Sequence, residues 1–296
     1  MKRKKPPLTF AIIGAGMVGT AIGVLLGKAG YRVAAVADCS AAHLKRAASY
    51  IDAPGFSLPA QAASRADCIL LTTPDDRISS VCGEIAARSD VKGKKVFHMS
   101  GAGGLDLLAP AALAGARTAC IHPLQSFSSI EGAIASIPGS YFGVTAAAGA
   151  KKLAADIVRD LQGILIPIPA AQKPLYHAAA CVASNYLVSL LSVVESIYKS
   201  IGFSEKDARR AYLPLVYGSL KNIENQGCPN ALTGPIARGD SGTVQKHIDA
   251  MARHLPDFTS LYAQMGAVAV KLAREKGTLS AAQAKEILNM LKRSVT

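Results

Sequence analysis

The sequence predicts an α/β protein in which a doubly wound, mostly parallel sheet is followed by an all-α domain. Over residues 8–169, short apolar runs alternate with longer stretches of helical periodicity, as in β-α-β units. After Pro167 and Pro169 the strand signals stop and helical periodicity continues alone. A glycine-rich turn directly follows the first apolar run. We therefore predict one domain over residues 1–169 and a second over residues 170–296.

Each predicted strand is a compact run of β-branched or small apolar residues bounded by Gly, Pro, Asp or Lys. The strands are expected at residues 8–13, 32–37, 68–73, 95–99, 118–122, 140–145 and 163–168. Gly or Pro separates the helical segments of the second part. Its helices are expected at residues 172–201, 204–226, 243–253, 257–276 and 280–293.

Composition limits the classes of function. Half of the 296 residues are apolar and 18% are charged, which excludes disorder as the main state. The 33 Lys and Arg exceed the 20 Asp and Glu, but the excess is spread along the chain. The basic run is confined to residues 2–5, and there is no Trp. This distribution favours anionic small molecules as ligands, and we predict no nucleic-acid partner.

The cysteines and the apolar segments bear on the compartment. Six cysteines show neither a C-x-x-C pair nor metal-ligand spacing, so we expect reduced thiols, mostly buried, in a cytoplasmic protein without metal. The apolar run after the basic N-terminus is soon broken by glycines, unlike a signal peptide. Leu175–Val194 lacks charge but contains polar residues, so we interpret it as a buried core helix and predict no membrane span.

The glycine-rich turn predicts a dinucleotide site. Its residues, Gly14-Ala15-Gly16-Met17-Val18-Gly19, form a G-x-G-x-x-G pattern between a strand and an apolar helix. Gly14 permits the tight turn, Gly16 leaves space for the pyrophosphate, and Gly19 lets the helix approach the strand. The helix N-terminus offers amide donors to phosphate. A glycine turn without a ligand is the alternative, which the β-α-β context disfavours.

The choice between NAD and NADP stays open. Asp38 ends the second strand, where an acidic residue contacts the ribose hydroxyls of NAD. Ser40, Lys45 and Arg46 follow and could instead hold a 2′-phosphate. Asp38 could also simply cap the next helix.

Thr73 and Pro74 close the strand at residues 68–73, on the edge of the sheet where such folds bind ligand. They could lie along the nicotinamide side of the cofactor. The alternative is an ordinary turn in which Asp75 or Asp76 caps a helix.

Three histidines are predicted to approach the same edge. His98 and His122 close strands, and His177 begins the long helix. A neutral imidazole can donate or accept the proton that accompanies reduction of C=O or C=N, so we predict His177 or His98 as the proton donor. Ser100 and His122 are predicted substrate contacts. For any single histidine, a core imidazole satisfied by the backbone is the alternative.

The long helix carries a polar stripe. Cys181, Ser184 and Asn185 follow His177 at offsets of 4, 7 and 8, which is one helical face. We predict that Asn185 orients the substrate. No H-x-x-x-H or Cys/His spacing indicates zinc, and we predict no metal.

A Gly- and Pro-rich segment at residues 229–240 interrupts the helical part. We predict that Thr233 and Arg238 contact an anionic substrate there, because a rigid loop that displays a cation suits that role. The alternative is a connection between helices in which Arg238 and Asp240 only cap helix ends.

These motifs together resemble a known family. They are Gly14–Gly19, Thr73-Pro74-Asp75, His98-x-Ser100-Gly101, His122–Phe127 and Leu232–Asp240. The combination resembles uncharacterised Rossmann-like oxidoreductases whose second half is a domain of unknown function. Their layout is similar to pyrroline-5-carboxylate reductase, ketopantoate reductase and the β-hydroxyacid dehydrogenases, with a helical domain like the C-terminal domain of phosphogluconate dehydrogenase. The resemblance covers nearly the whole chain and implies substrate binding between the domains and a homodimer through the helical domain.

One departure limits the transfer of mechanism. The β-hydroxyacid dehydrogenases place a catalytic Lys four residues before an Asn on the first long helix, whereas Cys181 occupies that position before Asn185. We predict an NAD- or NADP-dependent oxidoreductase that transfers hydride to or from a small, anionic carbonyl/hydroxy or imine/amine substrate. The alternative is a catalytically silent NAD(P)-binding sensor or assembly module, since a fold does not specify a reaction.

Overall fold

The computed structural model describes residues 8–294, so the basic run at residues 2–5 lies outside the described residues. The chain divides into two compact units, Met1–Asn185 and Tyr186–Thr296. The sheet ends at Pro167, close to the domain boundary predicted at residue 169. The first unit extends further because the start of the long helix packs against the edge of the sheet through Lys173 and Tyr176.

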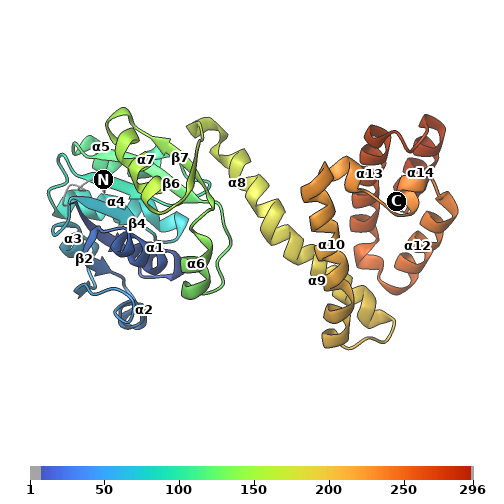
Figure 1. Ribbon diagram of the computed structural model, residues 1–296, viewed down its shortest axis with the longest axis horizontal. Helices are drawn as coiled ribbons and strands as arrows, with labels where there is room; N and C mark the ends of the chain where they lie inside the picture. Colours follow the sequence, from blue (N-terminus) through green and yellow to red (C-terminus); the bar gives the residue numbers. More distant parts are fainter. Residues whose placement is uncertain (1–7, 295–296) are drawn as a thin grey trace. The chain divides into compact units, whose positions relative to one another are not determined.

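The first unit is built on a sheet with strand order β3-β2-β1-β4-β5-β6-β7-β8 (Figure 1). Neighbouring strands are parallel except β6 and β7, which are antiparallel. This confirms the predicted doubly wound, mostly parallel sheet. The strands are β1 (Thr9–Ile13), β2 (Arg32–Ala37), β3 (Gly55–Phe56), β4 (Cys68–Leu71), β5 (Lys95–His98), β6 (Arg117–Pro123), β7 (Tyr141–Ala146) and β8 (Ile164–Pro167).

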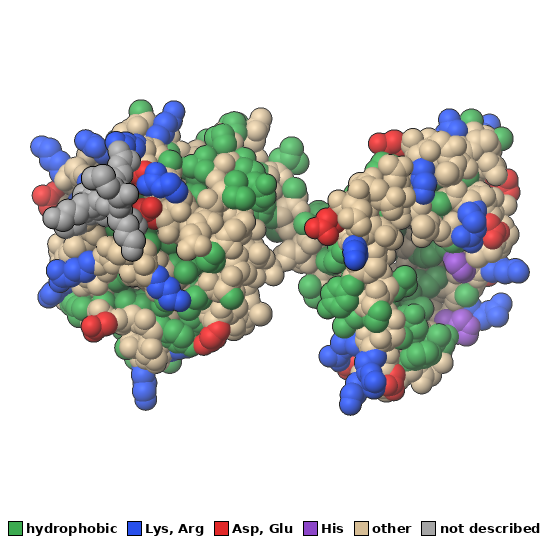
Figure 2. Space-filling view, in the orientation of Figure 1, with side chains coloured by type: hydrophobic (Ala, Val, Ile, Leu, Met, Phe, Trp, Pro, Cys, Tyr) green, Lys and Arg blue, Asp and Glu red, His purple; other side chains and the backbone are tan. Residues whose placement is uncertain are grey.

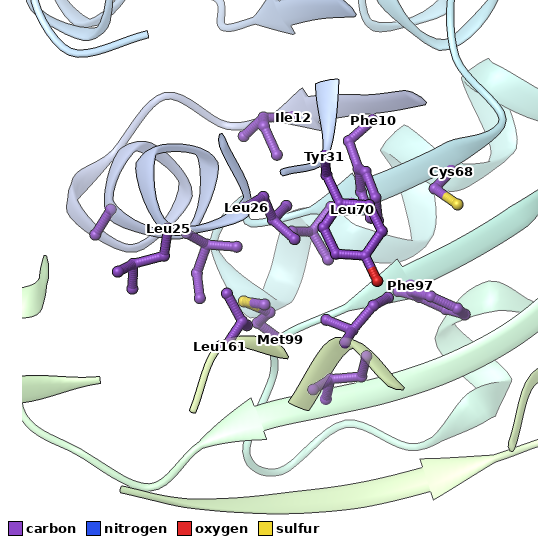
Figure 3. Close-up of a cluster of buried hydrophobic side chains, with 14 of the residues drawn as sticks. Phe10, Ile12, Leu25, Leu26, Tyr31, Cys68, Leu70, Phe97, Met99 and Leu161 are labelled. Atoms are coloured by element: carbon purple, nitrogen blue, oxygen red, sulfur yellow. The ribbon is translucent and has the colours of Figure 1, made fainter. Parts of the chain in front are cut away.

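The helices of this unit cover both faces of the sheet, because alternate residues of a buried strand point to opposite sides. Phe10 and Ile12 of β1 face one apolar cluster, whereas Ala11 and Ile13 face another. Figure 3 shows the first cluster, in which Leu25 and Leu26 of α1 pack beside the strands. The helices are α1 (Met17–Lys28), α2 (Ala41–Ala47), α3 (Pro59–Ala63), α4 (Asp75–Arg88), α5 (Ala109–Leu113), α6 (Ile130–Ser136), α7 (Lys151–Asp160) and α8 (Lys173–Cys181).

The second unit is helical, as predicted. Its helices are α9 (Leu187–Ser200), α10 (Glu205–Ala231), α11 (Pro235–Arg238), α12 (Ser241–His254), α13 (Thr259–Lys276) and α14 (Ala281–Arg293). The periodicity located the last two helices well, and Ser280 and Gln283 form a capping box at the start of α14. α10 is longer than predicted, and it bends at Gly227, where φ is +75°.

The long helix differs from the prediction in two respects. A π-helical turn at Val182–Tyr186 separates α8 from α9. The segment Ala170–Ser200 is long and apolar enough to cross a membrane by length and composition, and none of its most apolar 18-residue window is buried within the chain. The prediction of a buried core helix was therefore wrong, because the apolar periodicity identifies the helix but not what covers it.

Several large apolar side chains of the second unit are exposed. Figure 2 shows them grouped around α9 and α10, whereas Lys and Arg are scattered over the same view. They include Val188, Leu215, Tyr217, Leu220 and Ile223.

Candidate functional site

The turn between β1 and α1 has the predicted form, and two of its glycines are required by the protein itself. Gly14 has φ of +107°, and a Cβ there would lie 2.7 Å from the carbonyl carbon of Thr72. A Cβ at Gly19 would collide with the carbonyl oxygen of Gly14 and the hydroxyl of Thr72. These two positions therefore shape the turn and bring α1 against the sheet.

Gly16 has no such internal reason to lack a side chain. No atom of residues 8–294 lies within 4 Å of a Cβ built at this position, and its φ is −70°. α1 begins at Gly16 without a side-chain cap and without an acidic residue in its first turn. No side chain therefore caps the first amides of this 12-residue helix, and the space beside the backbone of Gly16 is open. This arrangement suits the pyrophosphate of a dinucleotide.

Asp38 lies beside this turn. Its carboxylate accepts the N–H of Ala15 at 2.7 Å and that of Ser40 at 2.8 Å, and it pairs with His43 Nδ1 at 3.2 Å. Ser40, not Asp38, is the N-cap of α2, where it accepts the N–H of His43. Asp38 therefore lies beside the glycine turn, and its contact with the ribose of a coenzyme stays a prediction. The helix-cap alternative applies to Ser40 instead.

Thr73 and Pro74 occupy the predicted edge, just beyond β4. Thr72 fastens this segment to the glycine turn by donating its hydroxyl to Gly14 O at 2.7 Å. Pro74 is the N-cap residue of α4. The hydroxyl of Thr73 is buried and has no hydrogen-bond partner among the described residues. An unsatisfied buried hydroxyl costs about 1–3 kcal/mol, which a ligand at this edge would relieve.

Asp75 and Ser100 join the ends of β4 and β5. Ser100 donates its hydroxyl to Asp75 Oδ2 at 2.6 Å and accepts the N–H of Gly103 at 2.7 Å. Asp75 therefore serves this network, and the helix-cap role considered for it does not apply.

His98 is an internal residue. Its side chain is fully buried, Nδ1 accepts the N–H of Ser100 at 3.1 Å, and Nε2 lies 2.9 Å from Gly104 O. Burial lowers the pKa of His98 to about 4, so the ring is neutral at pH 7. Both ring nitrogens are occupied by backbone. The core-imidazole alternative thus describes His98, which leaves it no atom with which to donate a proton to substrate.

His122 ends β6 and is held by Tyr176 of α8. Its Nδ1 lies 2.9 Å from the Tyr176 hydroxyl. Burial, followed by the charges of Lys173 and His177, lowers the pKa of His122 to about 4. Burial raises the pKa of Tyr176 to about 12. The Tyr176 hydroxyl thus engages Nδ1, and Nε2 is the ring nitrogen through which His122 can contact a ligand.

His177 meets His122 above Gly101. A Cβ at Gly101 would lie 2.9 Å from His122 Nε2 and closer still to His177 Nδ1, so both nitrogens converge on this glycine. The rings cross at 83° with centroids 5.9 Å apart. His177 Nε2 lies 3.5 Å from Cys181 Sγ, whereas Nδ1 is buried without a hydrogen-bond partner among the described residues. We call these two side chains the histidine pair.

Lys173 is a member of this site that the sequence reasoning missed. Only 1% of its side chain is exposed, and Nζ donates to Ser100 O at 3.1 Å and to Cys120 Sγ at 2.9 Å. A signal existed in the sequence, since Lys173 precedes His177 by four residues and extends its helical face by one turn. Tyr176 was missed as well, because nothing local marks it as a partner of a histidine.

The remaining predicted site residues are not brought to the histidine pair by contacts within the first unit. Asn185 is exposed in the π-helical turn, where the wider turn breaks the four-residue spacing from His177 and Cys181. Thr233 and Arg238 are exposed in the second unit, around α11. Asp240 caps α12 by accepting the N–H of Thr243 at 3.0 Å, in line with the helix-connection alternative.

The described residues contain no group of three or more His, Cys, Asp or Glu side chains placed to hold a metal ion.

The fold and the glycine turn place the first unit in the Rossmann class of α/β domains. Residues 2–123 match the family model of the Rossmann-like domain, and residues 140–269 match that of a domain of unknown function, DUF2520. The protein thus joins a Rossmann-like domain to a DUF2520 domain, as the motifs suggested. None of the curated proteins matches the chain significantly.

Solved structures share the fold over most of the chain. A protein of Thermotoga maritima is 21% identical, with a TM-score of 0.71 over 90% of this chain and 99% of its own. The reductive aminase of Aspergillus terreus, in complex with NADPH, is 17% identical, with a TM-score of 0.60 over 98% and 94% of the two chains. A pyrroline-5-carboxylate reductase of Coxiella burnetii is 17% identical, with a TM-score of 0.57 over 98% of both chains.

Proposed function

We propose that the protein is an NAD- or NADP-dependent oxidoreductase that interconverts a small carbonyl and alcohol, or an imine and amine. The observation that carries this proposal is the open backbone at Gly16 beside the uncapped start of α1. No contact within the described residues requires glycine at this position, whereas a bound diphosphate would require the open space and the free amides. The similarity in fold to a reductive aminase in complex with NADPH supports the same class of reaction.

The histidine pair would handle the proton in this reaction. A bound nicotinamide would supply or accept the hydride at the substrate carbon. The heteroatom of the substrate must then gain or lose a proton, and a neutral imidazole does either. Tyr176 engages His122 Nδ1, and His177 Nδ1 has no partner in the described residues, so His122 Nε2 and His177 Nδ1 are the nitrogens that can reach substrate. Asn185, Thr233 and Arg238 remain our candidates for orienting an anionic substrate.

The coenzyme proposal is tested by melting the protein with NADH and with NADPH separately. At a hundredfold excess over Kd, binding to the folded state stabilises by about 2.7 kcal/mol, which should raise Tm by roughly 5 °C or more. The larger shift identifies the favoured coenzyme, and cyclic imines and 2-oxo acids are then screened for coenzyme oxidation. Absence of any shift with millimolar coenzyme would refute the proposal. Binding with a nicotinamide face blocked by protein would favour the silent sensor.

We further propose a homodimer built through the helices. Tyr186 and Val188 are 65% and 68% exposed, and residues 174–194 carry no Lys, Arg, Asp or Glu. A second copy is a better cover than lipid, because the same helix carries His177, an imidazole that hydrocarbon could not satisfy. The six cysteines are free, and we propose a cytoplasmic location on that basis.

We expect a solution mass of about twice 30.6 kDa by light scattering. Val188→Glu should shift the mass to that of one chain, because a buried charge in an apolar interface is costly. Leu113→Glu is the matched control, since Leu113 is 90% exposed on α5, in the first unit. A monomeric wild-type protein would disprove the dimer without bearing on the coenzyme.

A further inference from the structure

Lys173 presents a problem that the proposed reaction does not explain. Its ammonium is buried, yet no carboxylate lies within ion-pair distance of it among residues 8–294, and its partners are a carbonyl oxygen and a thiol. Burial of a cation is expensive, and replacement of such a group by an apolar side chain often stabilises a protein. A lysine that is too buried to touch substrate must therefore act through its neighbours.

The contacts of Lys173 join three elements of the site. Ser100 follows β5, Cys120 lies in β6, and Lys173 itself is the first residue of α8. Cys120 precedes His122 by two residues, which places both on the same side of the strand. Tyr176 and His177 follow Lys173 by three and four residues, one helical turn along the same face. The ammonium thus links β6, which carries His122, to α8, which carries His177.

We propose that Lys173 is a positioning residue for the histidine pair: its buried ammonium fastens the first turn of α8 to the ends of β5 and β6. This sets where His177 meets His122 above Gly101 and disfavours a positive charge on His122. The catalytic importance of this arrangement rests on the proposed function. The positions of the side chains do not depend on that proposal.

Electrostatics support the same role. After burial, the charge of Lys173 is the largest influence that lowers the pKa of His122, ahead of His177. Asp75 opposes it by raising that pKa. The titratable groups around the ring are Lys173, Tyr176 and His177 on α8, His98 on β5, Cys120 on β6 and Asp75 at the start of α4. Loss of the lysine charge would therefore move the pKa of His122 upward.

The test follows the imidazole carbons of the full-length protein by NMR as a function of pH, without coenzyme or substrate. His122→Asn identifies the His122 signal. In the wild type we expect that signal to titrate at about pH 4. A midpoint near the ordinary value of about 6.5 would already overturn the proposal, because it would show that neither burial nor a nearby cation lowers the pKa of the ring.

Two variants separate the effect of the Lys173 charge from that of its hydrogen bond to Ser100 O. Lys173→Met removes both, and Lys173→Gln removes the charge but keeps an N–H donor for Ser100 O. Both should raise the midpoint of His122 by roughly one pH unit, the scale expected for one nearby charge. Only Lys173→Met should also shift the His177 signals. Lys151→Met, an exposed lysine on α7, is the control and should change neither.

The outcomes are distinguishable from those of the proposed function. Unchanged His122 and His177 signals in both lysine variants would overturn the positioning role, whatever the coenzymes do. Failure to bind NADH or NADPH would refute the proposed function, but it would not change the titration midpoint of His122 in the wild type or in the lysine variants. With a substrate in hand, the acid limb of kcat/KM for oxidation should move to higher pH in Lys173→Met, because a base with a raised pKa is lost earlier as pH falls.

Discussion

Replacement of His177 by Asn lowers turnover about 10²- to 10⁴-fold, the range expected for loss of a general acid or base, and leaves coenzyme affinity nearly unchanged. The reason is geometric. His177 Nδ1 is a buried nitrogen with no partner among the described residues, directed at the same point as His122 Nε2. Asparagine keeps a polar side chain on α8 but cannot move a proton. The measurement is kcat with a substrate from the imine and oxo-acid panel.

Gly101→Ala tests the same pair without changing either histidine. The added Cβ would occupy the space of His177 Nδ1 and lie 2.9 Å from His122 Nε2, so the ring of His177 must turn away. We expect a loss of turnover comparable to that of His177→Asn and a small change in Tm. His254→Asn, at an exposed position on α12, is the control. If His177→Asn and Gly101→Ala both turn over at the wild-type rate, the histidine pair has no part in catalysis.

Replacement of Gly16 by Val weakens NADH and NADPH binding at least about 100-fold. The side chain would occupy the open space beside the start of α1, where the diphosphate is expected. Loss of two charge-assisted hydrogen bonds, about 1.5–3 kcal/mol each, accounts for that factor. The protein itself should fold normally, because no atom of the described residues lies within 4 Å of the new Cβ. Coenzyme titration by fluorescence and Tm of the free protein are the two measurements.

Gly27→Ala is the matched control for Gly16→Val. Gly27 also belongs to the α1 region, and a Cβ there meets nothing within 4 Å. Alanine in a helix is favoured over glycine by about 1 kcal/mol, so this variant should melt slightly higher and bind coenzyme as the wild type does. Wild-type affinity in Gly16→Val would show that the diphosphate does not lie against this turn, and the coenzyme proposal would fail with it.

The fold was largely predictable because its signals are local. Runs such as residues 32–37 and 95–99 are apolar and β-branched, and β2 and β5 formed there. β3 was missed because two residues, Gly55 and Phe56, are too short to show a pattern. The antiparallel pairing of β6 with β7 was not predicted either, since an individual strand does not record the direction of its neighbour.

The candidate site was only partly predictable. His98 and His122 look alike in sequence, since each lies at the end of an apolar strand. Backbone groups enclose His98, whereas His122 is a member of the histidine pair. The polar stripe of the long helix was correct from His177 to Cys181 but not beyond, because nothing in the periodicity revealed the π-helical turn. The role of Thr233 and Arg238 stays a prediction.

The sequence alone determined the strand and helix pattern, the glycine turn and the edge of the sheet at which polar residues gather, because each depends on residues close together in the chain. Only the tertiary structure decided which side chains form the site. Lys173, for example, contacts Ser100 and Cys120, which precede it in the chain by 73 and 53 residues. Burial, hydrogen-bond partners and the ionisation of a histidine are properties of such distant contacts, and no local pattern encodes them.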